Sequence, residues 1–321
     1  MGDSITPRAT APEALTRAAL EAVRRFAEQS RSAATRRAYQ ADWRDFSRWC
    51  EARALPHLPA APVTVAAYLA ESAARLKPST LQRRLASISQ AHQLAGHPSP
   101  TRDEQVRTVL KGIRRVRGTA PAQKAAAGTE VVRALVAALG DDLAGLRDRA
   151  LLLVGFAGAF RRSELVALDA ADVTFAPEGM LLRLRRSKTD QEGRGETKGI
   201  PLGKNAGTCP VRALQAWVRA AAITEGPLFR RVDRWGRVGA ARLSDRSVAR
   251  VVQRAAAAAG FDPADYAGHS LRAGFATSAA AAGVSDRAIM RQTGHRSRQM
   301  LDRYVRAGGV FRENAAAEVG L

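Results

Sequence analysis

The chain has few cysteines, few aromatic residues and no long apolar run. Its 321 residues include only Cys50 and Cys209, whose wide separation excludes a disulfide framework and a cysteine-rich zinc site. Aromatic residues make up 5% of the chain, so its cores are expected to consist mainly of Ala, Leu and Val. No run of about eighteen apolar residues is present, and the N-terminus "MGDSITPRATAPEAL" lacks the apolar segment of a secretory signal. We therefore expect a protein of a reducing compartment, the cytoplasm.

Acidic residues are scarce beside basic ones. Lys and Arg total 51 against 30 for Asp and Glu, which gives a formal net charge of +21. Only six of the basic residues are lysines, a bias that a GC-rich genome would also produce. Such a genome would not by itself create the surplus of positive charge. A surplus spread along the chain predicts a polyanionic partner, namely nucleic acid, and the alternative is a basic protein that has no such partner.

The N-terminal part carries five helical patterns. The clearest has Tyr39, Trp43, Phe46 and Cys50 on one face, spaced as an amphipathic helix requires. The helices are expected at about residues 13–29, 35–54, 62–76, from 78–79 onward, and 102–115. The segment that follows is rich in Ala and Gly and has no apolar period, which is typical of a linker. We divide the chain into a flexible tail (1–12), a helical domain (13–117), a linker (118–129) and a second domain (130–321).

The second domain is expected to be mixed. Helical patterns flank the segment "ADVTFAPEGMLLRLRRSKTDQEGRGETKGIPLG", which alternates and breaks at Gly and Pro. This pattern predicts a small sheet of two or three strands with a Gly-rich turn near 190–196. Ser244 and Ser285 are expected to cap helix N-termini, and Gly260, Gly283 and Gly294 to end helices. The fold class is therefore mainly α, with one small antiparallel sheet.

One alanine-rich stretch holds an unusual set of reactive side chains. His269 and Arg272 lie three residues apart near the start of a predicted helix, and Tyr304 follows His295 by nine residues. A tyrosine can act as a nucleophile if a neighbour accepts its proton and an electrophile is held in place. A phosphodiester becomes such an electrophile when guanidiniums neutralise its oxygens, and a helix N-terminus also favours an anion. The set therefore indicates phosphodiester transesterification.

A second arginine for that phosphate is offered by "GAFRRSELVAL". Arg161 and Arg162 both stand here, and Glu164 lies one helical turn after Arg161, where it could hold a guanidinium or a histidine in place. Taken singly, each of these residues is more often a surface or packing residue than a catalytic one.

Together these segments resemble the tyrosine recombinase, or phage integrase, family. The family's first box, G-x-x-R-x-S-E-L, is matched by residues 158–165; its second, H-x-x-R, by residues 269–272; and its third, G-H with a Tyr nine residues later, by Gly294, His295 and Tyr304. The N-terminal helical patterns are similar to those of the Cre-like, two-domain type. The order and spacing of the boxes make the resemblance specific.

The resemblance implies roles for the matching residues. Tyr304 would attack the scissile phosphate and form a 3′-phosphotyrosyl link, while Arg161 and Arg272 would hold the phosphoryl oxygens. His269 would accept the tyrosine proton and His295 would hydrogen-bond the phosphate.

Three further assignments follow from the same resemblance. Glu164 would order His269 or Arg161. Lys188 would protonate the leaving 5′ oxygen, with Lys198 across the predicted hairpin as the competing lysine. Arg162 could exchange roles with Arg161, although the family register favours Arg161. No metal, nucleotide or other cofactor is expected, because the covalent link stores the bond energy.

The resemblance also implies a C-shaped clamp around double-stranded DNA, and four protomers that exchange strands on two sites through a Holliday junction. The arginines expected to contact DNA are Arg37, Arg44, Arg83, Arg246 and Arg250. The tail after Tyr304 is expected to dock on a neighbouring protomer. No arm-type DNA-binding domain is expected before the helical domain. The alternatives are a type IB topoisomerase, which relaxes DNA without joining partners, and a catalytically silent DNA-binding protein.

Overall fold

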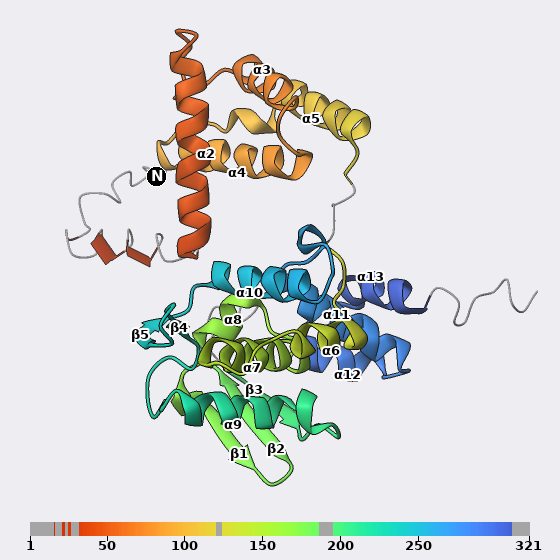
Figure 1. Ribbon diagram of the computed structural model, residues 1–321. Helices are drawn as coiled ribbons and strands as arrows, with labels where there is room; N and C mark the ends of the chain where they lie inside the picture. Colours follow the sequence, from red (N-terminus) through yellow and green to blue (C-terminus); the bar gives the residue numbers. More distant parts are fainter. Residues whose placement is uncertain are drawn as a thin grey trace, which may run out of the picture. The chain divides into compact units, whose positions relative to one another are not determined.

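The protein divides into two compact units, Met1–Pro121 and Ala122–Leu321. The computed structural model describes residues 32–119, 124–185 and 195–309, together with residue 16 and the pairs 21–22 and 25–26. Figure 1 shows a first unit made of helices and a second unit of helices with small sheets. This confirms the predicted fold class. The helix expected at residues 13–29 falls largely outside the described residues.

The first unit contains four described α-helices. They are α2 (Ala33–Glu51), α3 (Pro62–Ser72), α4 (Pro78–Leu94) and α5 (Glu104–Arg117), with the short η1 (Pro100–Arg102) before α5. Proline opens α3 and α4, where its missing N–H and fixed φ are tolerated, and the carboxylate of Asp103 caps α5. Phe46, Leu81 and Ile88 are fully buried in one apolar cluster shared by these helices. α4 thus turns Leu81, Leu85 and Ile88 toward this core.

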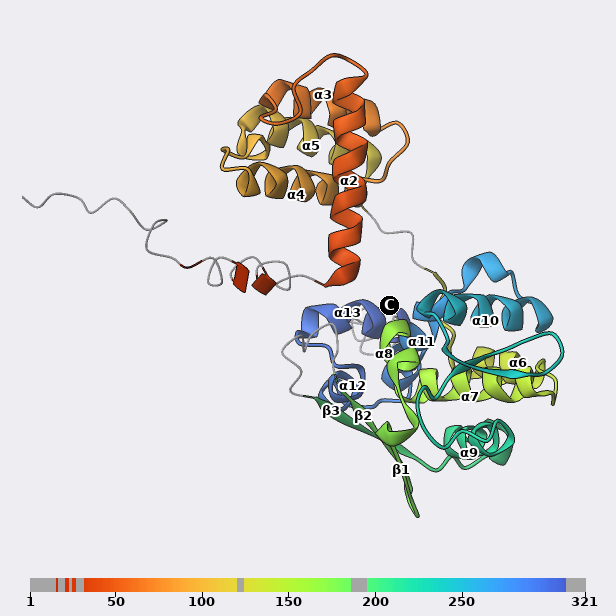
Figure 2. The ribbon, with the colours of Figure 1, turned by 90° about the vertical axis from the view of Figure 1, so that its left-hand side faces the viewer.

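The second unit begins with three helices that lead to the first reactive residues. They are α6 (Thr129–Ala137), α7 (Leu143–Ala157) and the short α8 (Arg162–Ala167). The carboxylate of Asp142 caps α7 by accepting a hydrogen bond from the Gly145 N–H at 2.7 Å. α7 is buried along most of its length, which fits its nearly continuous apolar sequence. Figure 2 shows α7 inside this unit, with α10 on one side and α9 on the other.

A three-stranded antiparallel sheet follows α8. The strands are β1 (Val173–Ala176), β2 (Gly179–Leu184) and β3 (Glu196–Pro201), in the order β1-β2-β3. The register places Leu182 opposite both Val173 and Lys198. The antiparallel sheet predicted here is confirmed, while its predicted turn near 190–196 lies mostly outside the described residues.

A second sheet was not predicted from the sequence. β4 (Arg230–Val232) and β5 (Val238–Arg242) form an antiparallel ribbon with an irregularity between Arg230 and Val232. The ribbon follows α9 (Pro210–Ala220) and leads directly into α10 (Asp245–Ala258). Its strands are short and rich in arginine, so they give no clear alternation of apolar and polar residues.

The described part of the second unit ends in three helices that carry the remaining reactive residues: α11 (Gly268–Ala281), α12 (Asp286–Thr293) and α13 (Arg298–Gly309). The predicted caps are confirmed, because the hydroxyls of Ser244 and Ser285 accept backbone hydrogen bonds at the starts of α10 and α12. The predicted stops are confirmed too. Gly260, Gly283 and Gly294 have φ values of 81°, 77° and 66°, which glycine adopts without strain.

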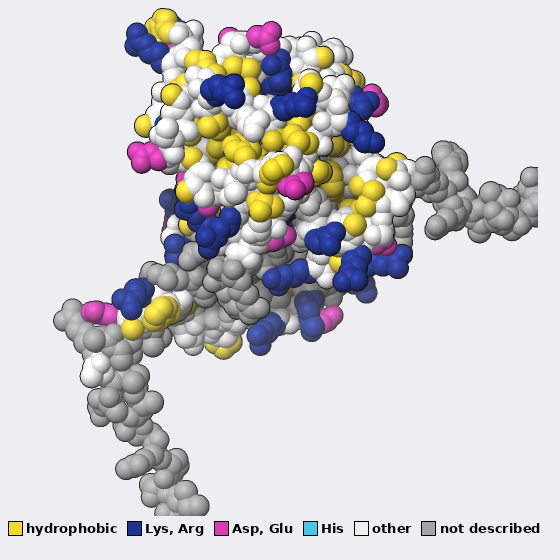
Figure 3. Space-filling view, turned by 90° about the horizontal axis from the view of Figure 1, so that it is seen from below, with side chains coloured by type: hydrophobic (Ala, Val, Ile, Leu, Met, Phe, Trp, Pro, Cys, Tyr) yellow, Lys and Arg dark blue, Asp and Glu magenta, His cyan; other side chains and the backbone are white. Residues whose placement is uncertain are grey.

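Basic side chains outnumber acidic ones on the surface drawn in Figure 3. On the face drawn in Figure 3, Lys and Arg are scattered widely, with fewer Asp and Glu between them. None of the described helices is long and apolar enough to cross a membrane.

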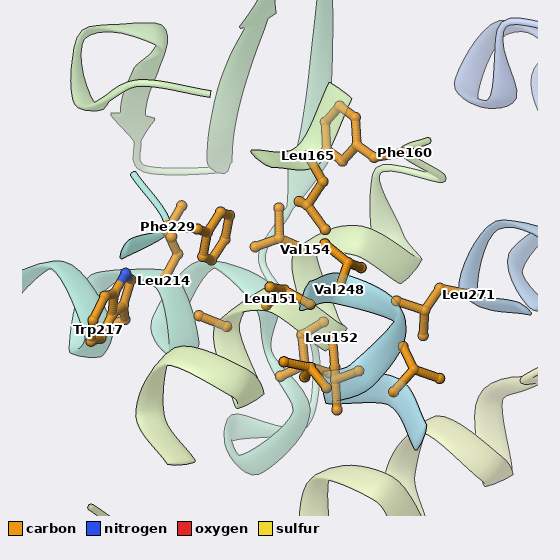
Figure 4. Packing of buried hydrophobic residues seen from close by; sticks show 14 of the residues in the cluster. Leu151, Leu152, Val154, Phe160, Leu165, Leu214, Trp217, Phe229, Val248 and Leu271 are labelled. Carbon is orange, nitrogen blue, oxygen red and sulfur yellow. The ribbon is translucent and has the colours of Figure 1, made fainter. Parts of the chain in front are cut away.

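The core of the second unit lies around α7. Leu151, Leu152 and Val154 of α7 lie in one buried cluster with Trp217 of α9 and Leu271 of α11 (Figure 4). The indole N–H of Trp217 donates a hydrogen bond to the Leu228 carbonyl at 2.9 Å, so this buried polar group is satisfied. Aliphatic residues dominate the cluster, as the low aromatic content predicted. The core thus fixes α11 and the α7–α8 connection relative to each other.

Candidate active site

The segment between α7 and α8 is shaped by tight backbone packing. A Cβ at Gly158 would lie 2.1 Å from the Phe160 ring, so only glycine fits there. Ala159 has a φ of 47°, a left-handed conformation that costs a non-glycine residue about 1 kcal/mol. Arg272 Nη1 donates to the Ala159 carbonyl at 2.8 Å. The turn therefore brings the first box of the sequence against α11.

Arg161 is fixed by Glu164. The Glu164 carboxylate is 4% exposed, accepts a hydrogen bond from the Arg161 backbone N–H at 2.9 Å and pairs with the Arg161 guanidinium. Of the two partners considered for Glu164, His269 and Arg161, the structure pairs it with Arg161. The neighbouring Arg162 is exposed and its side-chain carbons pack over Gly268. Arg161, not Arg162, therefore lies beside the other reactive residues.

α11 presents His269 and Arg272 from its first turn. Gly268 begins the helix, and Arg272 is 1% exposed whereas His269 is exposed. The helix comes so close to the start of the second unit that a Cβ at Gly274 would lie 1.8 Å from the Ala127 carbonyl oxygen. This close approach holds α11 in place.

Tyr304 lies against both histidines. His269 Nε2 lies 3.1 Å from the Tyr304 hydroxyl, within hydrogen-bond distance. The His295 ring stacks on the Tyr304 ring, with centroids 5.7 Å apart and planes 13° apart. His295 follows the left-handed Gly294 and its Nδ1 lies 3.0 Å from the Thr293 hydroxyl. The second and third boxes therefore meet at the Tyr304 phenol, and Arg272 ties the second box to the Ala159 carbonyl of the first.

Positive charge is concentrated at this point. Burial and the nearby Arg161 guanidinium lower the pKa of Arg272. Burial, followed by Arg272 and Arg161, lowers the pKa of His295 to about 4, so its ring is neutral at pH 7. Neighbouring positive charge thus disfavours the protonated forms of Arg272 and His295, and an anion placed among these groups would offset that charge. The arrangement suits a phosphate.

Lys188, the lysine that the family resemblance favours as proton donor, lies outside the described residues. Lys198, its competitor, is 3% exposed on β3 and donates a hydrogen bond to the Gly158 carbonyl at 3.0 Å. It also donates to the Gln292 carbonyl. Burial lowers its pKa to about 8, although Glu196 and Glu164 act in the opposite direction. Lys198 therefore belongs to the same group of charged side chains as Arg161, Glu164 and Arg272, called the active-site cluster below.

Two residues near the cluster were missed. Gln292 Nε2 donates to the Ala157 carbonyl at 2.8 Å, which ties the end of α12 to the end of α7. Thr293 contacts His295 as described above. The one sequence signal for the two was their place directly before the Gly294-His295 box.

No group of three or more His, Cys, Asp and Glu residues that could hold a metal is found among the described residues.

The arginines expected to contact DNA are all exposed. Arg37 and Arg44 lie on α2, Arg83 on α4, and Arg246 and Arg250 on α10. The Arg83 guanidinium donates two hydrogen bonds to the Asp42 carboxylate, at 2.7 and 3.0 Å. Part of its bonding capacity is thus used inside the first unit, and contact with DNA stays a prediction for all five.

The model of the phage integrase family matches residues 128–308, and that of the phage integrase N-terminal SAM-like domain matches residues 23–97. The chain belongs to the phage integrase family. The resemblance inferred from the boxes is confirmed, and this integrase-family protein is a tyrosine-type site-specific DNA recombinase.

Similar proteins span nearly the whole chain. An integrase/recombinase xerD homolog of Selenomonas ruminantium is 43% identical over 93% of this chain and 89% of its own length. The recombinase cre of Escherichia phage P1 is 27% identical over 82% of this chain and 81% of its own length. A crystal structure of a lambda integrase fragment, a dimer bound to a core site, superposes with a TM-score of 0.60 at 18% identity, covering 89% of this chain and 93% of that one. At this identity the superposition supports the fold alone.

Proposed function

We propose that the integrase-family site cleaves and rejoins double-stranded DNA through a 3′-phosphotyrosyl intermediate. The observation that supports this most directly is the phenol of Tyr304, 3.1 Å from His269 Nε2 beside the buried Arg272. Tyr304 Oη forms a bond to phosphorus as the bond from phosphorus to the 5′ oxygen breaks. His269 accepts the phenol proton, and the reverse reaction returns it.

The arginines stabilise the charge that builds on the phosphoryl oxygens. Arg161, oriented by Glu164, and Arg272, oriented by the Ala159 carbonyl, bind the two non-bridging oxygens. His295 is neutral at pH 7 and donates a hydrogen bond to the phosphate through the nitrogen that does not face Thr293. The role of Glu164 is therefore to position Arg161.

A lysine protonates the leaving 5′ oxygen, and two lysines are candidates. Lys198 is the better supported, because it lies in the cluster and its pKa of about 8 suits a proton donor near neutral pH. In this structure its ammonium is bonded to the carbonyls of Gly158 and Gln292, so it must leave at least one of them to reach the DNA. Lys188 is retained as the alternative.

We also propose that four protomers act on two DNA sites and exchange strands through a Holliday junction in the bacterial cytoplasm. This follows from membership of the family, because exchange between two duplexes requires four cleavages. The C-shaped clamp, the docking of the tail and the DNA contacts of the five arginines stay predictions.

The decisive experiment traps the covalent intermediate. The protein is incubated with nicked DNA suicide substrates made from the sequence around its gene, and adducts are separated under denaturing conditions. Wild-type protein is expected to form an adduct joined to a 3′ end, and Tyr304→Phe to form none while binding DNA normally. An adduct in Tyr304→Phe would refute the assignment. No adduct in either protein would favour a silent DNA-binding protein, and supercoil relaxation without strand exchange would favour a topoisomerase.

A further inference from the structure

The tip of the β4–β5 ribbon carries an aromatic residue that the active site does not use. Trp235 is 66% exposed. The guanidinium of Arg234 lies 4.1 Å from the centroid of its ring, and that of Arg237 lies 5.9 Å away. An exposed indole accompanied by two cations on one turn is not explained by packing, because burial is what normally stabilises a tryptophan.

The turn that presents Trp235 is ordered by its own hydrogen bonds. The Asp233 carboxylate accepts from the backbone N–H groups of Trp235 at 2.9 Å and Arg237 at 2.8 Å. The Asp233 N–H donates to the Arg237 carbonyl at 3.0 Å, and Gly236 has a φ of 78° that closes the turn. Asp233 is also the only acidic residue from Gly226 to Ser244. The tip is thus both rigid and nearly free of negative charge.

The base of the ribbon is anchored in the second unit. Phe229 and Leu243 flank it and are buried, and the Leu243 N–H donates to the Phe229 carbonyl at 2.9 Å. The Arg242 guanidinium donates to the carbonyls of Val166 at 2.6 Å and Leu168 at 3.1 Å, at the C-terminal end of α8. The ribbon therefore projects from a fixed base.

The remaining arginines of the ribbon continue the charge of α10. Arg231, Arg234 and Arg237 are exposed, and no ion pair found among the described residues involves them. β5 runs through Leu243 and Ser244 into α10, whose Arg246 and Arg250 are also exposed. Figure 1 shows the ribbon beside the start of α10. Basic side chains thus extend from the helix to the ribbon tip.

We propose that the ribbon tip, Trp235 with Arg234 and Arg237, is a DNA-contacting element that binds duplex DNA beside the stretch contacted by α10. The proposal rests on the DNA partner of the proposed function. A two-stranded ribbon fits the major groove, guanidiniums pair with phosphates, and the indole packs on the sugars or base edges. A second copy of the chain is a poorer occupant, because each copy carries a net charge of +21.

The test compares two double variants of the full-length protein. Arg234→Ala/Arg237→Ala removes two charges from the tip, and Arg212→Ala/Arg219→Ala removes two from exposed positions on α9, which lies on the other side of α7 from α10. Affinity for a long random-sequence duplex is measured over a range of salt concentrations. The ribbon variant should bind DNA more weakly, and the magnitude of its slope of log K against log salt concentration should be smaller by about 1–2. The α9 variant should match wild type in both. Equal slopes in the two variants would overturn the proposal.

Trp235 itself supplies a second readout. The emission that wild type has and Trp235→Phe lacks should be quenched readily by acrylamide in the free protein. Bound duplex should protect it several-fold. Unchanged quenching on saturated DNA would contradict the proposal, and so would an association between copies of the protein that is lost in Trp235→Ala while DNA affinity stays the same.

Different results would reject the ribbon proposal and the proposed cleavage chemistry. Ribbon variants at saturating protein should still form the covalent adduct, because the tip lies outside the active site. Tyr304→Phe should form no adduct and should keep the wild-type salt slope. A normal slope in the ribbon variant with normal adduct formation would thus reject the ribbon proposal alone.

Discussion

At the scale of single residues, the site brings several cationic side chains close together without a matching number of anions. Burial is the largest cause of the lowered pKa values of Arg272, Lys198 and His295. Arg161 contributes to lowering all three, and Arg272 contributes to lowering those of Lys198 and His295. Glu164 compensates only part of this charge, and it is committed to Arg161. A phosphodiester placed among these groups would supply the missing negative charge. The DNA-free site therefore carries an unfavourable energy that binding relieves.

His295 gives this idea a pH dependence. Its pKa is lowered to about 4 in the folded protein, against an ordinary value of 6.5. Between pH 6.5 and 4 the His295 imidazole is protonated in the unfolded chain but stays neutral in the folded protein. The contribution of His295 to folding stability is therefore present above pH 6.5 and is lost as the pH falls toward 4. Between pH 7.5 and 5 the loss should be about 2 kcal/mol, measured by urea unfolding. His295→Gln should lose less over the same range.

The control is His97→Gln, which alters an imidazole in the first unit. It should show the same pH dependence as wild type, because His97 lies in the first unit and not among the reactive residues around Tyr304. Inorganic phosphate, an anion that this cationic site can bind, should also reduce the loss of folding stability that wild type shows on acidification. If His295→Gln and wild type lose the same stability on acidification, the depressed pKa is wrong.

The identity of the proton donor can be decided with a modified substrate. If Lys198 protonates the 5′ oxygen, Lys198→Met should cleave ordinary DNA at least about 100-fold more slowly, the contribution typical of general acid catalysis. A bridging 5′ sulfur leaves without a proton, so single-turnover cleavage of that substrate should return to near the wild-type rate. Lys188→Met is the matched variant, and it should be rescued instead if Lys188 is the donor.

Wild-type cleavage of ordinary DNA should also fall as the pH rises above about 8, the pKa of Lys198. The sulfur substrate should not show that fall. A rate that depends on pH identically with both substrates would argue against Lys198.

The two lysines also illustrate how far residues can be assigned from sequence. Tyr304, Arg161, Arg272 and the histidines could be named because each occupies a fixed place in a box. The lysines belong to a segment predicted as a hairpin, where small changes in register exchange the inward and outward positions. A usable signal was present, because Lys198 precedes the apolar Ile200 by two residues, and strand residues two apart share a face.

At the scale of elements, the position of α11 controls the site, because this helix carries both His269 and Arg272. Gly274 lets the helix approach the backbone of Ala127, where a Cβ would lie 1.8 Å from the carbonyl oxygen. Gly274→Ala should therefore destabilise the second unit by about 1–3 kcal/mol and slow cleavage, because α11 must shift. Thermal unfolding and adduct formation measure the two effects.

Gly112→Ala is the matched control in α5. A Cβ there meets nothing within 4 Å. The same substitution should stabilise the first unit by about 0.5–1 kcal/mol, since alanine is the better helix former. If both changes shift stability in the same direction, the close approach of α11 does not have the assigned role.

Elements were predictable where the sequence marks their ends. Pro62, Pro78, Ser244 and Ser285 begin helices at the predicted places, and the glycines end them. The β4–β5 ribbon was missed for a physical reason. Its strands are three and five residues long, and most of their side chains are exposed, so neither face carries an apolar repeat. The ribbon is specified by the Asp233 turn and by its buried base, which are tertiary features.

At the scale of the whole molecule, each unit has its own hydrophobic core. The first unit buries Phe46, Leu81 and Ile88, and the second buries Leu151 and Trp217 in a separate cluster. The boundary between the compact units lies near residue 121, and the finer division into a tail, a helical domain, a linker and a second domain stays a prediction. Units with separate cores can unfold separately, and only a ligand that contacts both would couple them.

Leu81→Ala and Leu214→Ala test this independence, since both leucines are fully buried, one in each core. Each should lose about 2–4 kcal/mol in its own unit and leave the other unchanged. Trp43 and Trp49 report on the first unit and Trp217 on the second, so variants that retain one set of indoles follow each transition by fluorescence. Without DNA, Leu81→Ala should shift only the unfolding transition of the first unit. With saturating duplex, both transitions should rise, and Leu81→Ala should then also lower the second, because weakened folding of one unit removes part of the shared binding energy. Transitions that move together without DNA would mean that the units are stabilised by each other and not by their own cores.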